Sequence, residues 1–337
     1  MKYSLYIVFS VLLVSASACK KMTFQPQPEN SQTAIFDYFY KAYQEDYVLF
    51  DQRNVNWEDQ YNTYRPMVSD EMSDADLFER LKDMVAPLND GHVKLIAPNE
   101  IQYTPNIYYQ TRLEDDLFDL ELIKSKYLKD DYEVNGYGFN TYGMIENDIA
   151  YVHMVWTSDN WEGMDEILSY SDPAKGLIID LRHNGGGDFT LAFSRMGRFT
   201  QEERLAFTSK TKNGAGPNDF TAPYAWKIYP EGEYFDKKIM VLTDRYTISA
   251  GERLVMALQT LPNVTTVGDT TNGSISSMIL RELPNAWNFS VCPQQVESHD
   301  GMNYEGIGLI PDVLIENTSA QMQAKTDATL EHALSLF

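Results

Sequence analysis

Short apolar runs that alternate with helical patterns in the second half of the chain constrain its fold more than any other feature. The runs at residues 176–181, 239–242 and 264–267 are continuous and short, as in strands buried on both faces of a sheet. Helical patterns follow the first two runs, at residues 189–199 and 249–261. Strands that alternate with helices form βαβ units. The chain is therefore predicted to form an α/β fold with a largely parallel sheet.

The region before this core is predicted to be helical. Apolar residues recur at helical spacing from Ile35, and Ser73 begins a second helix that ends at Pro87. Residues 144–156 have the pattern of a β-hairpin, and residues 327–337 that of an amphipathic closing helix. We therefore expect an N-terminal helical domain at 33–96, a tyrosine-rich connecting segment at 97–143 and an α/β core at 144–337.

Composition excludes two classes of protein. Hydrophobic residues make up 43% of the 337 residues, which is too many for a disordered chain. The 27 Lys and Arg residues face 49 Asp and Glu residues, a formal net charge of −22. Nucleic-acid binding requires clustered positive charge, so this balance argues against a nucleic-acid partner.

The first nineteen residues have the pattern of a secretory signal peptide. Lys2 precedes an apolar stretch at residues 3–14, and the small residues 15–18 precede Cys19. A cysteine in this place resembles a bacterial lipobox, in which the cysteine is lipidated; the alternative is an ordinary signal with a chance cysteine. Residues 20–32 then form a tether. We expect a protein of the cell envelope, lipid-anchored to the outer or inner membrane through Cys19, with its domain periplasmic or extracellular.

Two segments carry more chemistry than their secondary structure requires. The sequence Asp-Leu-Arg-His-Asn-Gly-Gly-Gly at 180–187 follows a buried strand, and its glycines can present free N–H groups to an oxyanion. The alternative is a tight turn between a strand and a helix. Ser249 opens a helix after another buried strand, where a nucleophile is favoured by the helix N-terminus. The alternative for Ser249 is an N-cap.

A serine nucleophile needs a base and a carboxylate. His92 follows the turn Asn89-Asp90-Gly91, where a functional side chain is easily placed, whereas His153 and His332 lie in regular elements. Glu305 lies among turn residues near the end of the chain. Spacing by itself does not join these residues into one site.

These segments resemble the signature of the C-terminal processing (tail-specific) peptidases and the related tricorn core domain, in the same order along residues 35–337. The resemblance implies a core of the ClpP/crotonase type and a serine peptidase without cofactor or metal. It implies Ser249 as nucleophile, His92 as base and Glu305 as the carboxylate that orients the base. The oxyanion hole is then expected from the backbone N–H groups of Gly186, Gly187 and Ala250.

The chain departs from that family in three places. Members with a Ser–Lys dyad carry a lysine in the stretch that corresponds to residues 270–275, where this chain has Ser274 and no lysine. The tricorn-like branch has a serine before its histidine, where this chain has Gly91. The stretch between His92 and Ile149 is too short for a PDZ domain, so we expect none.

The resulting prediction is a serine-type peptidase that hydrolyses peptides or unfolded proteins outside the cytoplasm by a Ser–His–Glu acyl-enzyme mechanism. A non-catalytic ligand- or peptide-binding lipoprotein on the same fold is the alternative. An α/β-hydrolase esterase is disfavoured, because that fold runs in the order Ser, acid, His and needs a Gly-x-Ser-x-Gly motif that is absent around Ser249.

Overall fold

The computed structural model describes residues 29–98, 102–111, 117–146 and 148–337. The predicted signal peptide, Cys19 and the tether up to residue 28 lie outside the described residues. In the described part of the chain, no helix is both long and apolar enough to cross a membrane.

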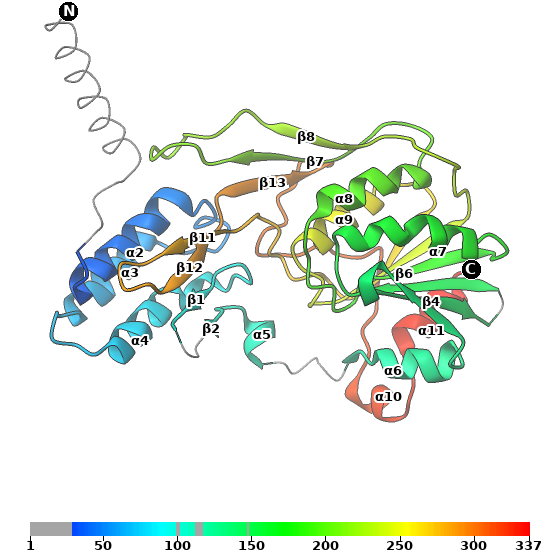
Figure 1. Ribbon diagram of the computed structural model, residues 1–337, viewed down its shortest axis with the longest axis horizontal. Helices are drawn as coiled ribbons and strands as arrows, with labels where there is room; N and C mark the ends of the chain where they lie inside the picture. The colour runs from blue at the N-terminus through cyan, green and yellow to red at the C-terminus, as the bar shows by residue number, and fades with distance from the viewer. Residues whose placement is uncertain (1–28, 99–101, 112–116, 147) are drawn as a thin grey trace, which may run out of the picture.

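Most helices of the described residues fall into an N-terminal group or a group that covers the main sheet, and the short α5 lies between the two (Figure 1). Their bounds are α2 Gln32–Asp46, α3 Trp57–Tyr64, α4 Asp74–Val85, α5 Ile107–Thr111, α6 Leu120–Leu122, α7 Met164–Tyr170, α8 Phe189–Arg195, α9 Ala250–Leu258, α10 Ser319–Gln323 and α11 Ala328–Ser335.

The strands of the described residues form three sheets, with the orders β14-β10-β9-β6-β5-β4-β3, β11-β12-β1-β2 and β13-β7-β8. Their bounds are β1 Leu95–Ile96, β2 Gln102–Tyr103, β3 Tyr132–Asn135, β4 Asn140–Ile145, β5 Ile149–Met154, β6 Gly176–Asp180, β7 Arg204–Thr211, β8 Tyr224–Ile228, β9 Lys238–Thr243, β10 Val264–Gly268, β11 Ile279–Glu282, β12 Asn288–Val291, β13 Gln294–Ser298 and β14 Val313–Leu314.

The seven-stranded sheet is the α/β core. Its strands from β14 to β5 are parallel, and β4 and β3 continue it antiparallel. Alternate residues of β6 pack to opposite sides: Leu177 and Ile179 join the cluster with α7, α8 and α9, while Ile178 joins the cluster with α11. Helices therefore cover both faces of the sheet (Figure 1), which is why its strands are continuously apolar. The predicted α/β fold with a largely parallel sheet is confirmed.

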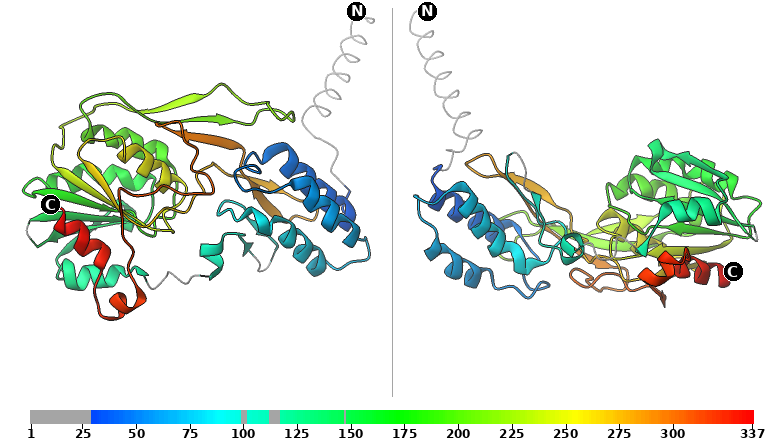
Figure 2. Two further views of the ribbon diagram at one scale, coloured as in Figure 1. Left: turned by 180° about the vertical axis from the view of Figure 1, so that it is seen from behind. Right: turned by 90° about the horizontal axis from the view of Figure 1, so that it is seen from below.

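The N-terminal helices α2, α3 and α4 pack on the four-stranded sheet rather than on the core (Figure 2). Two strands of that sheet, β11 and β12, come from residues 279–291 and pair with β1. The ring of Phe289 in β12 packs against that of Phe39 in α2 with their centroids 5.0 Å apart. A late segment of the chain thus completes the N-terminal unit. The predicted core at 144–337 is therefore not one continuous domain, because residues 279–291 leave it and pack with the N-terminal helices.

The connecting segment also differs from its prediction. Strand β3 at Tyr132–Asn135 and most of β4 at Asn140–Ile145 already belong to the seven-stranded sheet. The sheet therefore begins before residue 144. The predicted hairpin is present as β4 and β5, paired from Asn140 with Met154 to Ile145 with Ile149.

Candidate active site

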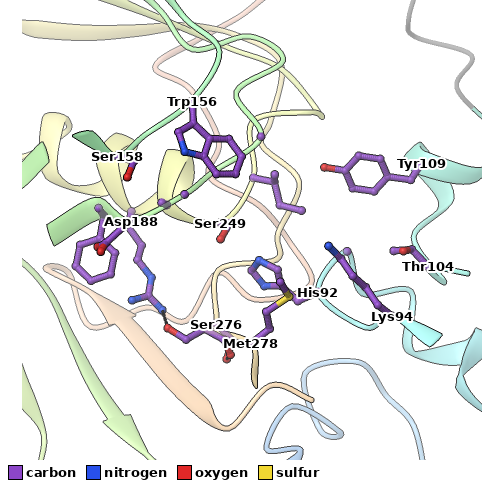
Figure 3. Close-up of a pocket in the computed structure, with 18 of the residues that line it drawn as sticks. His92, Lys94, Thr104, Tyr109, Trp156, Ser158, Asp188, Ser249, Ser276 and Met278 are labelled. Carbon is purple, nitrogen blue, oxygen red and sulfur yellow. Dashed lines mark hydrogen bonds between the residues drawn. The ribbon is translucent and has the colours of Figure 1, made fainter. Parts of the chain in front are cut away.

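Ser249 lies at the junction between strand β9 and helix α9 in a strained backbone conformation. Its φ of 62° and ψ of −121° are costly for a residue with a Cβ atom and differ from the extended conformation of an N-cap. Gly186 leaves room for it, because a Cβ atom at Gly186 would lie 2.6 Å from the Cβ atom of Ser249. The conformation presents the Ser249 side chain to a cleft (Figure 3). Ser249 is thus the N-cap residue of α9, but its side chain makes no cap hydrogen bond, and such strain is typical of a functional residue.

The carboxylate of Glu252 holds this junction in place from inside. Its Oε2 atom accepts the backbone N–H groups of Ser249 at 3.1 Å and Ser274 at 3.0 Å. Its Oε1 atom accepts the Thr271 hydroxyl at 2.6 Å and the Gly273 N–H at 2.7 Å. Burial raises the pKa of Glu252 to about 7. Its place three residues after the serine is the one signal for this anchor in the sequence.

His92 faces Ser249 across the cleft (Figure 3). The Asp90 carboxylate accepts the His92 backbone N–H at 2.8 Å, which fixes the turn before the imidazole. The Nδ1 atom of His92 is buried and has no hydrogen-bond partner among the described residues. Nε2 is then the ring nitrogen on the cleft side. No hydrogen bond joins the imidazole to the Ser249 Oγ atom in the described contacts, as is common in free enzymes.

Asp90 is the carboxylate nearest the imidazole. One carboxylate oxygen of Asp90, the Sγ atom of Cys292 and a ring nitrogen of His92 all lie within 4.8 Å of one another. Asp90 also accepts the hydroxyl of Tyr47 at 2.8 Å and lies 3.6 Å from the guanidinium of Arg53. Burial raises the pKa of the Cys292 thiol strongly, so it stays protonated and donates to Asp90. Asp90 thus joins the Tyr47 hydroxyl, the Cys292 thiol and the Arg53 guanidinium in one buried cluster beside the imidazole.

Glu305 does not contact His92 directly in the described residues. Its Oε1 atom is paired with Arg53 at 2.6 Å, and its Oε2 atom accepts the backbone N–H groups of Ile275 and Ser276. Arg53 thus bridges Glu305 to Asp90. The predicted pairing of Glu305 with the imidazole is replaced by an indirect connection, because α3 and its preceding loop bring in an arginine that the sequence did not reveal as a site residue.

Residues 180–187, called the glycine loop below, supply backbone donors beside Ser249. The Gly186 N–H, predicted as an oxyanion donor, is already bonded to the Asn184 side chain at 3.0 Å, and the Gly185 N–H to a main-chain carbonyl. Gly187 and Ala250 both line the cleft, and their N–H groups have no acceptor among the described residues. We therefore retain Gly187 and Ala250 as oxyanion donors.

Ser274 and Gly91 fit together where the related peptidases have other residues. The Oγ atom of Ser274 accepts the Gly91 N–H at 2.9 Å and donates to the Asn272 side chain. A Cβ atom at Gly91 would lie 2.6 Å from Cδ1 of Ile248. A serine at position 91 would therefore require the end of the Ile248 side chain to move, and Ser274 makes structural contacts in place of acting as a base.

The first residues of the glycine loop are structural. Arg182 is buried between Asp180 and Asp327, and the Asn184 side chain binds the carbonyl of Met154 at 2.6 Å. These contacts tie the loop to the sheet and the closing helix.

The cleft in which Ser249 and His92 meet has a volume of about 710 Å³. Its walls come from both units, from the glycine loop and α9 on one side and from the β1–β2 region on the other. The remaining lining residues include Lys94, Gln102, Thr104, Tyr109, Trp156, Ser158, Asp188, Phe189, Arg253, Ser276, Ser277 and Met278. A cavity of this size and open shape suits a peptide.

Two family models match the chain. The one for peptidase family S41 covers residues 148–315, and the one for the tricorn protease C1 domain covers residues 28–86. The chain belongs to peptidase family S41. The S41 match contains the glycine loop, Ser249 and Glu305, and the resemblance predicted from the sequence is confirmed.

Relatives of this S41 chain include curated carboxy-terminal-processing proteases. The protein of Bartonella bacilliformis is 27% identical over 55% of this chain and 43% of its own length. That of Synechocystis sp. is 29% identical over 48% of this chain and 37% of its own length. The chain thus spans less than half of each. The solved structure of a candidate peptidase from Parabacteroides merdae is 29% identical, with a TM-score of 0.82 over 91% of this chain and 97% of that one.

Proposed function

We propose that this S41 chain is a serine peptidase that hydrolyses peptides or unfolded proteins with Ser249 as nucleophile and His92 as base. The observation that carries the proposal is the strained Ser249 at a helix N-terminus, facing His92 across a cleft wide enough for a peptide. The family match and the names of the curated relatives support the same reaction class.

In this mechanism His92 takes the proton of Ser249 through Nε2 as the Oγ atom attacks a peptide carbonyl. The N–H groups of Gly187 and Ala250 stabilise the negative charge on the tetrahedral oxygen, and one such donor contributes about 10²- to 10³-fold to the rate. His92 then gives its proton to the leaving amine. Water, activated by the same imidazole, hydrolyses the acyl-enzyme.

We propose that two carboxylates stabilise the imidazolium, Asp90 from beside the ring and Glu305 indirectly. An Asp90 carboxylate oxygen lies within 4.8 Å of a ring nitrogen of His92, and Arg53 links Asp90 to Glu305. We propose that Glu305 acts through Arg53 by keeping Asp90 and the segment at 275–276 in place. This arrangement retains the predicted residues and changes the contact through which the second acid works.

We also propose that the protein is anchored to a membrane of the cell envelope through a lipid on Cys19, with the peptidase domain outside the cytoplasm. The pattern of residues 1–19 supports this location.

Labelling with a fluorophosphonate tests the proposed function. The protein without residues 1–19 is expected to form a covalent adduct at Ser249, located by mass spectrometry, because an activated serine attacks the phosphorus atom. A folded protein that gives no adduct at Ser249 would favour the non-catalytic binding protein.

Hydrolysis is expected to remain active down to an unusually low pH. Burial, the largest influence, lowers the pKa of His92 to about 4 although the charge of Asp90 opposes it. The base is neutral, and so active, above this pKa. A profile of kcat/KM against pH should therefore fall near pH 4, and a fall centred near 6.5 would contradict the buried setting of the base. Asp90→Asn removes the charge that raises the pKa of His92, so this variant should lose activity at a still lower pH.

A further inference from the structure

The cleft wall contains a buried guanidinium whose partners are all neutral. Arg253 lies one turn of α9 beyond Ser249 and is 3% exposed. Its Nε atom donates to the Ile275 carbonyl at 3.0 Å, and its Nη2 atom donates to the side chains of Ser277 at 3.2 Å and Gln294 at 2.5 Å. Burying a cation without an opposite charge is costly. In the free protein, the positive charge of Arg253 therefore has no negatively charged hydrogen-bond partner among the described residues.

The other two buried arginines near the site each form ion pairs with two carboxylates. Arg53 is paired with Asp90 and Glu305, and Arg182 is paired with two aspartates. Among the described residues, no carboxylate lies within ion-pair distance of Arg253. Glu305 and Glu252 act on it only from a distance and are bound to other donors, so burial lowers the pKa of Arg253 to about 10.

The guanidinium is also held in a fixed orientation towards the cleft. It stacks on the rings of Phe189 at 4.7 Å and Phe207 at 5.3 Å. Its Nη1 atom donates to no described residue and is not among the enclosed unpaired atoms, so this end of the fork faces the cleft that Arg253 lines. Asp188, the acidic residue on the cleft wall, caps α8 through Thr190. Nη1 carries two N–H groups, and hydrogen bonds from a guanidinium to a carboxylate are charge-assisted and therefore strong.

We propose that Arg253 binds a carboxylate of the substrate beside the scissile bond, so that the cleft selects peptides with an acidic group at that place. The inference rests on the proposed function and names its substrate class. The carboxylate is either an Asp or Glu side chain or the free C-terminus of a peptide, since both present the same two oxygens. Lys94, which also lines the cleft, is the natural comparison because it is another cation beside His92.

The test is retention of peptides on immobilised Ser249→Ala protein, which binds without cleaving. The probe is a proteome-derived peptide library, used before and after methyl esterification of all its carboxylates, with retained peptides identified by mass spectrometry. Four synthetic versions of one retained peptide, with Glu or Gln and with a free or amidated C-terminus, then distinguish the two sources. The same measurements are made with Arg253→Gln and Lys94→Gln in the Ser249→Ala background.

We expect the free library to be retained about 10- to 100-fold more strongly than the esterified one, as for hydrogen bonds to a charged group. Arg253→Gln should bring this ratio towards one, and Lys94→Gln should keep it. Equal retention of both libraries, no retention of either, or a ratio that Lys94→Gln removes and Arg253→Gln does not, would overturn the inference.

Two further measurements separate the causes of failure. Arg253→Lys keeps the charge without the fork and is expected to keep part of the preference, which covers the case in which Arg253→Gln does not fold. Fluorophosphonate labelling of Ser249 in the parent protein reports on the proposed function by itself. A protein that forms the adduct and shows no carboxylate preference would refute the role of Arg253 while leaving the peptidase intact.

Discussion

Replacing Ser249 with alanine is expected to abolish the fluorophosphonate adduct and to lower kcat for peptide hydrolysis by about 10⁴-fold or more, with little change in KM. The physical reason is that the Oγ atom forms the acyl-enzyme, for which no other described group in the cleft is positioned. Residual hydrolysis would come from the donors at Gly187 and Ala250 acting on water. Adduct formation by mass spectrometry and turnover of a fluorogenic peptide measure the two effects.

Ser158→Ala is the matched control for that experiment. Ser158 lines the same cleft, and its hydroxyl makes no hydrogen bond to the described residues (Figure 3). Its alanine variant should keep both labelling and turnover within a fewfold of the parent. An adduct that persists in the Ser249→Ala protein, or turnover that survives the change, would rule out Ser249 as the nucleophile.

Replacing His92 with alanine is expected to lower kcat by a similar factor, because the Oγ proton then has no acceptor. Since the two residues act as one unit, the double variant should lose about as much as either single variant. Steady-state kinetics of the two single variants and the double variant measure this non-additivity. A double variant whose loss equals the product of the single losses would show that the residues act independently.

His183→Ala serves as the histidine control. His183 lies in the glycine loop, with its Nε2 atom 3.5 Å from the Asp244 carboxylate and its ring 4.6 Å from that of Tyr246. It is near the site without lining the cleft, so its loss should be mild. A collapse of activity in this variant equal to that of His92→Ala would point to disruption of the loop rather than to loss of a base.

Local signals in the sequence predicted the elements well. Ser73 accepts the N–H of Asp76 at the start of α4, as the capping pattern indicates, and the helix gives way at Ala86 just before Pro87. The continuous apolar run that begins at Gly176 forms β6, with helices on both faces. These features depend on neighbours within a few residues, so they can be predicted from a single short segment of the sequence.

Long-range pairing was beyond the reach of the same signals. Strands β11 and β12 return to the N-terminal helices, although residues 279–291 carry no local mark that distinguishes them from the core. Arg53 likewise lies in a loop far from any motif and yet joins Asp90 to Glu305. The contacts of β1 with β12 and of Arg53 with Glu305 join residues about 190 to 250 positions apart, and nothing in either segment specifies the other.

The sequence by itself determined the α/β core, the order of its elements and the residues Ser249, His92 and Glu305 as the ones to examine. Only the tertiary structure decided how they act: Ser249 occupies the N-cap of α9 in a strained conformation, Asp90 rather than Glu305 lies beside the imidazole, and the Gly186 N–H is already used. The reason is physical. Motifs record which chemical groups are present, whereas the distances on which hydrogen bonds and charge pairs depend are set by the packing of segments remote in the chain.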